Sequence, residues 1–139
     1  MPEDKTKHLL GIGAVEDIFN YVELGLDTFD CVLPTRLARQ GIVFFRPESG
    51  GTEENKFRYQ ISNAKFKESL NPLDKNCDCY TCKNFSQGYL HHLFKSKELL
   101  VHTLLTYHNL YFFKKMMDEI RESIEEGNFL ELKKKWLPN

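Results

Sequence analysis

The feature that most constrains this chain is a cluster of three cysteines within six residues: Cys77, Cys79 and Cys82 in the segment CDCYTC. A disulfide within the cluster is disfavoured, because cysteines two residues apart would close a strained loop. Clustered thiols without a bridge are typical metal ligands, and soft thiolates favour zinc. The cluster therefore predicts one structural zinc ion, which needs a fourth ligand to complete a tetrahedron.

Spacing narrows the choice of the fourth ligand without settling it. Cys31 lies in the apolar run FDCVLP, which favours a small buried residue over a ligand. Apolar residues from Leu90 to Leu105 recur at intervals of three, four and seven, which predicts an amphipathic helix. His108 extends that apolar face at the predicted helix end, whereas the neighbouring histidines lie off it: His91, His92 and His102. We take His108 as the candidate; the alternative is an ordinary buried histidine of the core.

The overall composition indicates a soluble protein with one core. The chain has 139 residues, of which 41% are hydrophobic, enough for a single sizeable core. A net charge of -1 gives no global positive field, so binding to nucleic acid would need a local basic patch. No apolar run approaches the roughly 20 residues of a membrane span, and MPEDKTKHLL lacks the apolar core of a signal peptide. We expect a cytoplasmic protein, whose cysteines stay reduced.

The N-terminal third has the pattern of a strand–helix–strand unit. The apolar run from His8 to Gly13 predicts a buried strand, and Val15 to Val22 then repeat at helical spacing up to a C-cap at Gly25. A second apolar run from Leu26 to Leu33 is closed by Pro34. Two strands joined by a helix pair in parallel, which indicates the α/β class.

The remaining elements follow in a readable order. Alternation in IVFF and from Phe57 to Ile61 predicts an antiparallel hairpin around the acidic loop ESGGTEEN. A separate last helix is predicted to end at Gly127, with a core stripe made of Leu110, Phe113, Met117, Ile120 and Ile124. The segment from Lys133 to Trp136 is expected to be a solvated tail.

Two features of this layout carry chemical interest. Asp30 stands near the carboxyl end of the second strand, the position where α/β barrels and sheets place active sites. The alternative is that Asp30 caps a loop or pairs with Arg36. Arg36 and Arg39, predicted to lie on the turn after Pro34, could clamp a phosphate or contact a base edge. Taken alone, the two arginines are better explained as an exposed surface pair.

Five segments together resemble the C-terminal portion of tRNA-guanine transglycosylase, the queuine tRNA-ribosyltransferase family: GIGAVEDI, GLDTFDCVLPTRLAR, NPLDKNCDCYTC, GYLHHLFKSKELL and HNLYFFKKMMDEIRESI. The resemblance covers nearly the whole chain. It implies the C-terminal part of a (β/α)8 TIM barrel with an inserted zinc-binding subdomain. In this scheme residues 1–45 hold the last parallel β/α units of the barrel, 46–108 the hairpin and zinc-binding subdomain, and 109–139 the C-terminal helix.

The resemblance also implies a reaction in queuosine biosynthesis. Asp30 matches the family's nucleophile, which attacks the ribose C1′ of the wobble guanosine in tRNA and expels guanine. The covalent aspartyl-ribose intermediate persists until a 7-deazaguanine base, queuine or its precursor, displaces the aspartate. The family's zinc ligands match Cys77, Cys79, Cys82 and His108.

Further roles are carried over by position. The base pocket is bordered by Leu10 and Gly11. The implied tRNA-contacting residues are Gly11, Ile12, Gly13, Ala14, Val15, Glu16, Asp17, Thr35, Arg36, Leu37, Ala38 and Arg39.

The chain departs from the family in length. A complete barrel needs about 250 residues, and only two parallel strands are predicted here. The family's second catalytic aspartate, the general acid/base, has no counterpart in this sequence. We therefore expect a fragment of an active enzyme, inactive alone, whose partners are tRNA, the free base, the remaining barrel and a second subunit in a homo- or heterodimer.

The alternatives are a non-catalytic accessory subunit, against which the intact FDCVLPTR argues, and a free-standing zinc-binding interaction module. The end of the chain soon after the last helix favours the queuine-type branch over the archaeal one.

Overall fold

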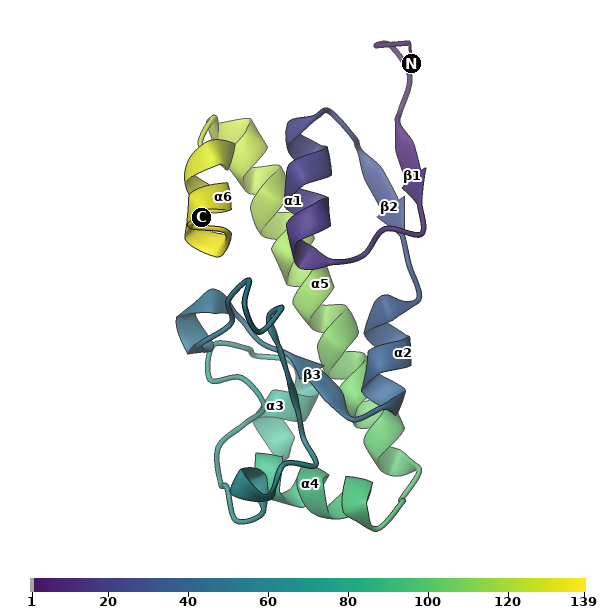
Figure 1. The fold of residues 1–139 in the computed structure, drawn as a ribbon, viewed down its shortest axis with the longest axis vertical. Coiled ribbons are helices and arrows are strands. Elements are labelled where there is room, and N and C mark those ends of the chain that lie inside the picture. Colours follow the sequence, from purple (N-terminus) through teal and green to yellow (C-terminus); the bar gives the residue numbers. More distant parts are fainter. Residues whose placement is uncertain (1) are drawn as a thin grey trace.

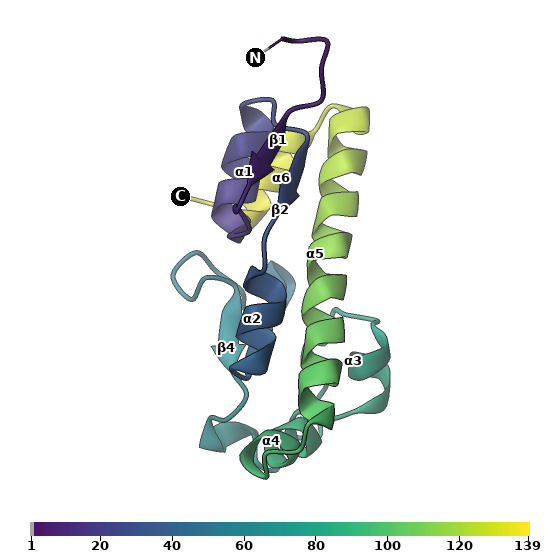
Figure 2. The same ribbon diagram turned by 90° about the vertical axis from the view of Figure 1, so that its right-hand side faces the viewer.

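The longest element of the fold is helix α5 (Leu100–Glu126), which runs along the length of the molecule (Figures 1 and 2). The structure is a computed structural model that describes residues 2–139. Two clusters of buried apolar side chains share this helix. Phe112, Met116 and Ile120 belong to one cluster, and Val101, Leu104 and Leu105 belong to the other. Helix α5 is therefore the scaffold that joins the two halves of the chain.

The N-terminal half contains the predicted strand–helix–strand unit. Strands β1 (His8–Leu10) and β2 (Thr28–Asp30) pair in parallel and are joined by α1 (Val15–Glu23). The register places His8 opposite Thr28 and Leu10 opposite Asp30. These findings confirm the α/β pattern and the parallel pair.

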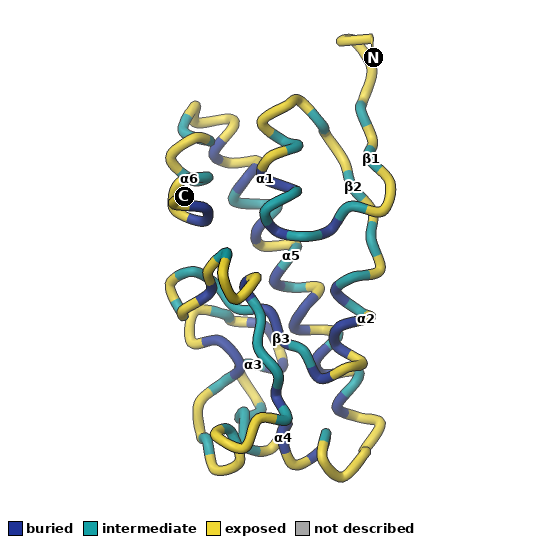
Figure 3. The backbone as a smooth tube through the Cα atoms, in the orientation of Figure 1, coloured by how far each residue is buried: buried dark blue, intermediate teal, exposed yellow. Residues whose placement is uncertain are grey.

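The predicted burial of β1 is wrong for this chain, and β2 is no more buried. Figure 3 draws β1 and β2 in the colours of exposed and intermediate residues, and Leu10 is 74% exposed. Parallel strands are normally covered on both faces and paired on both edges. Within residues 2–139 the sheet has only these two strands, so neither outer edge is paired.

Helix α2 (Leu33–Arg39) follows β2 directly. We predicted that Pro34 would close the strand and that Arg36 and Arg39 would lie on a turn. Pro34 instead occupies the first turn of α2, where its missing N–H costs no hydrogen bond. Both arginines are exposed residues near the end of this helix.

The predicted antiparallel hairpin is confirmed. Strands β3 (Ile42–Phe44) and β4 (Arg58–Gln60) pair with Val43 opposite Tyr59. Their connection contains a short 3-10 helix, η1 (Pro47–Ser49), and a second one, η2 (Ala64–Phe66), follows β4. The predicted boundary after residue 45 therefore falls inside the hairpin.

The long helical region differs from the prediction. Apolar spacing predicted one helix up to His108 and another after it, whereas the structure has α4 (Gln87–Lys95) and then the single helix α5. Lys97 adopts a left-handed backbone with φ 58, and Lys97 N donates to the carbonyl of Phe94. This C-terminal turn ends α4, although the apolar spacing continues across it. His108 therefore lies well inside α5, and the predicted boundary after residue 108 cuts a continuous helix.

The predicted stripe of the last helix is also partly wrong. Ile120 is buried, but Leu110 is 49% exposed and Ile124 is 55% exposed. Because α5 is continuous, its buried face must continue the face of Leu105 and His108. The buried residues farther along that face are Phe112, Met116, Ile120 and Ser123.

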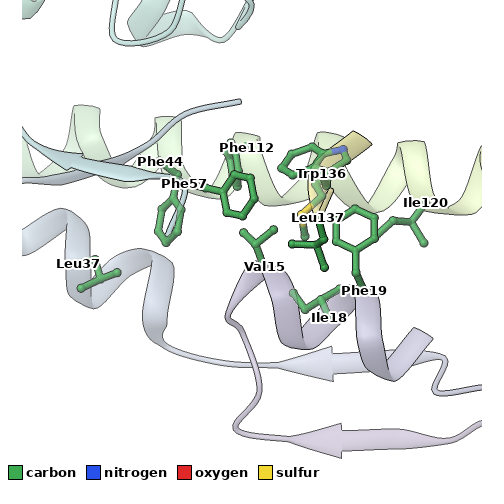
Figure 4. Packing of buried hydrophobic residues seen from close by; sticks show 11 residues of the cluster. Val15, Ile18, Phe19, Leu37, Phe44, Phe57, Phe112, Ile120, Trp136 and Leu137 are labelled. Carbon is green, nitrogen blue, oxygen red and sulfur yellow. The ribbon is translucent and has the colours of Figure 1, made fainter. Parts of the chain in front are cut away.

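The C-terminal segment is not a solvated tail. It forms helix α6 (Phe129–Trp136), and the indole of Trp136 is 1% exposed. Figure 4 shows Trp136 among the side chains of the first cluster, which consists of Val15, Ile18, Phe19, Leu37, Phe44, Phe57, Phe112, Met116, Ile120, Trp136 and Leu137. The spacing of Phe129, Leu132 and Trp136 is helical, and the lysine run between them hid this signal. Within residues 2–139, no helix has the length and apolar character needed to cross a membrane.

Candidate metal centre and strand-edge site

The three clustered cysteines meet His108 where helix α3 (Tyr80–Asn84) packs on α5. Cys77 precedes α3, Cys79 is its N-cap residue and Cys82 lies within it. The Sγ atom of Cys79 accepts a hydrogen bond from Cys82 N at 3.4 Å, which turns both sulfurs to one side. Thr81 fixes α3 to α5, because its hydroxyl donates to the carbonyl of Leu104 at 2.8 Å. The structure thus brings together all four predicted ligands.

The geometry of the four donor atoms fits one tetrahedral ion. His108 Nδ1 lies 3.7 Å from the sulfur of Cys77, 3.5 Å from that of Cys79 and 3.3 Å from that of Cys82. All four donor atoms lie within 4.8 Å of one another. Zinc–sulfur bonds of about 2.3 Å and zinc–nitrogen bonds of about 2.0–2.1 Å place sulfur and nitrogen about 3.6 Å apart in a tetrahedron. The donor set therefore has the size that a zinc ion requires.

The orientation of His108 is fixed by a contact on its other side. The imidazole is fully buried, and Nε2 lies 2.7 Å from the carbonyl oxygen of Phe44. A carbonyl only accepts, so Nε2 carries the proton and donates it. The lone pair of Nδ1 in the neutral ring then faces the three sulfurs, as a metal ligand must.

The electrostatics of the cluster favour a cation. Hydrogen bonds with Cys77 and Cys82 lower the pKa of Cys79, whereas hydrogen bonds with Cys77 and Cys79 raise the pKa of Cys82. Burial lowers the pKa of His108, but the hydrogen bonds with Cys77 and Cys79 outweigh it and raise the pKa to about 10. A divalent cation would stabilise all three thiolates together and replace the proton on His108 Nδ1.

The remaining histidines and Cys31 lie elsewhere. His91 is buried, with Nδ1 2.8 Å from the carbonyl oxygen of Ile61, and His92 is exposed. Cys31 follows β2, is half-buried, and its sulfur accepts from Leu33 N at 3.3 Å. Within residues 2–139, the one group of His, Cys, Asp and Glu side chains placed to hold a metal is the four-residue cluster.

The carboxyl edge of the parallel pair gathers the residues predicted for catalysis. Asp30 ends β2 with its side chain 64% exposed, and its Oδ1 lies 3.1 Å from His8 Nε2. The alternative pairing with Arg36 is therefore not the one that the structure has. Leu10, opposite Asp30, and Gly11 are both exposed at this edge. A Cβ atom at Gly13 would lie 2.6 Å from the Cβ of Cys31, so only glycine allows this loop to approach the end of β2.

The residues predicted to contact tRNA differ in exposure. Gly11, Arg36 and Arg39 are exposed, and neither arginine forms an ion pair with another residue of 2–139. The partly buried members are Ile12, Ala14, Glu16, Asp17 and Thr35. The buried members are Gly13, Val15, Leu37 and Ala38. Because the residues of this last group are buried, they could support a contact surface without forming it.

One structurally important residue was missed in the sequence. Asn109 is fully buried; its Oδ1 accepts from Phe44 N at 3.1 Å, and its Nδ2 donates to the carbonyls of Pro34 and Ile42. It therefore connects α2, β3 and α5 beside the metal cluster. The sequence feature that could have revealed Asn109 is its polar side chain next to His108, on an otherwise apolar helix face.

Comparison with known proteins places the chain in one family. The model of the family described as "Queuine tRNA-ribosyltransferase" matches residues 1–139. Queuine tRNA-ribosyltransferases of Caldanaerobacter subterraneus and Francisella tularensis subsp. novicida are 47% and 48% identical to this chain, over 99% and 100% of its length. A protein of Archaeoglobus fulgidus, whose assignment to the same activity is provisional, is 53% identical over 99% of the chain. The chain spans about a third of these relatives, 34% to 35% of their length. With the match over all 139 residues, the chain belongs to the queuine tRNA-ribosyltransferase family and corresponds to a C-terminal portion of its members.

Proposed function

We propose that this chain supplies the nucleophile and the zinc site of a tRNA-guanine transglycosylase, which exchanges a guanine of tRNA for a 7-deazaguanine base. The observation that carries the proposal is the exposed carboxylate of Asp30 at the carboxyl end of a parallel strand. Active sites of α/β barrels lie at this edge. A carboxylate there is available to a ligand approaching from solvent.

The reaction would proceed as a double displacement at the ribose. A carboxylate oxygen of Asp30 attacks C1′ of the wobble nucleotide, and the electron pair of the C1′–N9 bond leaves with guanine. An acid outside this chain protonates the departing base. In the second step the conjugate base of that acid takes the proton from N9 of the incoming base, N9 bonds to C1′, and the electron pair of the C1′–O bond returns to Asp30.

The remaining two thirds of the family's length would complete the active site. Among the described residues, 2–139, no further strand pairs with the outer edges of β1 and β2, and exposed Leu10 lies at one end of the pair. Both features suit a sheet that continues into further strands of a TIM barrel. The general acid/base and most of the base pocket would come from those strands.

The tRNA would lie across the same edge. Arg36 and Arg39 are exposed on α2, which follows β2, and the loop that follows β1 begins with exposed Gly11. Guanidinium groups bind phosphates strongly and bidentately. The two arginines would position the RNA backbone, while Leu10 and Gly11 would border the base.

Zinc would have a structural role in this enzyme. The four predicted ligands use every position of a tetrahedron, which leaves none for substrate. Cys79 and His108 are buried, and within residues 2–139 no hydrogen bond or ion pair joins the cluster to Asp30, whose carboxylate contacts His8. When bound, the ion would join α3 to α5.

The proposal can be tested in a reconstituted enzyme, which we define as this chain co-expressed with the N-terminal two thirds of the Francisella relative. Incubation with tRNA carrying a wobble guanosine should give a protein–tRNA adduct on denaturing gels. Asp30→Asn should abolish the adduct, because an amide is a poor nucleophile toward C1′. The chain alone should give no base exchange, since it has no general acid for the leaving base. An adduct that survives Asp30→Asn would remove Asp30 from the mechanism.

A further inference from the structure

We propose that His8 is a positioning residue for Asp30, an inference that rests on the proposed function. Strands β1 and β2 lie side by side (Figure 1). Alternate residues of a strand share a face, so the parallel register brings His8, Thr28 and Asp30 to one face of the pair. His8 Nε2 lies 3.1 Å from Asp30 Oδ1, and His8 Nδ1 lies 2.8 Å from Thr28 Oγ1. The imidazole therefore bridges a hydroxyl and the candidate nucleophile.

The direction of both hydrogen bonds follows from the chemistry of the groups. A carboxylate only accepts, so His8 Nε2 carries the proton and donates it to Asp30. In the neutral imidazole Nδ1 is then an acceptor, and the Thr28 hydroxyl donates to it. Thr28 thus selects the tautomer that points an N–H at Asp30. The second oxygen of Asp30, Oδ2, has no partner among residues 2–139 and is free to attack C1′.

The hydrogen bond from His8 to Asp30 favours the second chemical step, in which the carboxylate leaves C1′. In the covalent intermediate Oδ2 is bonded to C1′, and Oδ1 is the carbonyl oxygen of an ester. When the incoming base bonds to C1′ and the C1′–O bond breaks, negative charge returns to the carboxylate. A hydrogen bond to a charged acceptor is about twice as strong as one to a neutral acceptor, so the N–H of His8 stabilises this step. Bound tRNA would exclude water and strengthen the bond.

The test is a chase of the adduct in the reconstituted enzyme. The wild-type and variant adducts are formed at saturating tRNA and then mixed with excess guanine, and the rate of adduct loss is measured. His8→Leu should slow the chase about tenfold, equivalent to about 1.4 kcal/mol. His8→Gln, whose amide nitrogen can replace Nε2 as donor, should stay within about threefold of wild type. The apparent Kd for tRNA should be unchanged in both.

Substitutions of Thr28 give a second test of His8. They would not change the chase rate if His8 only supported the fold. Thr28→Val should slow the chase by about threefold, and Thr28→Ser should not. In the His8→Leu background Thr28→Val should add nothing, because it acts through the imidazole. His102→Leu, on α5 away from this edge, is the matched histidine control. A chase by His8→Leu at the wild-type rate would overturn the inference, whereas an adduct in Asp30→Asn would overturn the proposed function beneath it.

Discussion

The imidazole of His108 donates from Nε2 to the carbonyl oxygen of Phe44 across 2.7 Å, so the candidate metal cluster is hydrogen-bonded directly to the hairpin. The next residue on the helix, Asn109, accepts from Phe44 N at 3.1 Å. Two consecutive residues of α5 therefore hold both backbone groups of one residue of β3. We therefore expect a substitution of the candidate metal ligand His108 to affect this strand as well.

The first prediction concerns the ligand set. The purified chain should contain about one zinc ion, and His108→Ala should weaken zinc retention by more than about tenfold. His91→Ala is the matched control, since His91 is also buried and also bonded to a backbone carbonyl, that of Ile61. It should lower stability without releasing zinc. Metal content after dialysis measures both, and greater zinc loss from the His91 variant would refute the ligand assignment.

The second prediction concerns folding. Chelation should lower the melting temperature, because the free energy of metal binding to such sites is also free energy of folding. The loss of order should reach β3 through the bond between His108 and Phe44. Hydrogen exchange should therefore accelerate in residues 42–44 as well as 77–82. An unchanged melting temperature after verified removal of the metal would count against a structural role.

The sequence predicted the strands, the first helix and the cluster of three cysteines, since these features depend on short-range patterns. The cysteines lie within six residues, and period-two alternation marked the hairpin of β3 and β4. The parallel pair followed from one helix between two apolar runs. Residue type and spacing determine such features almost alone.

What the sequence could not predict depends on contacts between distant segments. Apolar spacing cannot distinguish one helix from two when a turn at Lys97 preserves the spacing. The lysines from Lys133 to Lys135 suggested solvent, yet Lys133 pairs with Glu23, and Trp136 is buried. The role of Asn109 requires knowing that α2 and β3 meet beside α5. The hydrogen bond between His8 and Asp30 likewise requires the strand register.

The third prediction concerns the docking of α6. The ring of Trp136 packs at tilted or edge-on angles against Phe19, Phe57 and Phe112, with ring centroids 5.5, 5.5 and 5.8 Å away. Trp136→Ala should lower the free energy of unfolding by about 3–5 kcal/mol, the range for large buried aromatic residues. Leu130→Ala, on the same helix but 58% exposed, should change it by less than about 0.5 kcal/mol. Denaturant unfolding of the zinc-loaded chain measures both, and equal effects would contradict the burial of α6.

The fourth prediction gives a role to the loop from Arg46 to Lys56. Burial raises the pKa of Glu48, but hydrogen bonds from Lys135 and Arg46 outweigh it and lower the pKa to about 2. Because the folded-state pKa is depressed, Glu48 stabilises the fold above its unfolded pKa of about 4.3, and this contribution is lost as the pH falls toward 2. The contact is partly exposed, so it contributes at most about 1 kcal/mol.

Glu48→Gln tests this contact. The variant should be less stable than wild type at pH 6, and the difference should shrink steadily as the pH falls from 5 toward 2. Release of zinc in acid affects both proteins equally and cancels in the difference. Glu54→Gln, in the same loop and exposed, should show no such pH dependence. A difference between Glu48→Gln and wild type that is constant with pH would rule out the ion pair with Lys135.

The last prediction separates tRNA binding from chemistry in the reconstituted enzyme. Arg36 and Arg39 are exposed on α2 and free of ion pairs within residues 2–139, so each can contact a phosphate without breaking a contact of the fold. Arg36→Ala or Arg39→Ala should raise the Kd for tRNA and reduce the salt dependence of binding by about one phosphate contact. At saturating tRNA the adduct should still form, because Asp30 is intact. Arg121→Ala, on α5, is a control for a lost surface charge: Arg121 is 70% exposed and pairs with Asp118 at 3.4 Å, and its loss should leave both quantities unchanged. Loss of the adduct at saturating tRNA would assign the arginines to the reaction itself. If Arg121→Ala changed the Kd for tRNA equally, the effect of Arg36 and Arg39 would come from net charge and not from specific phosphate contacts.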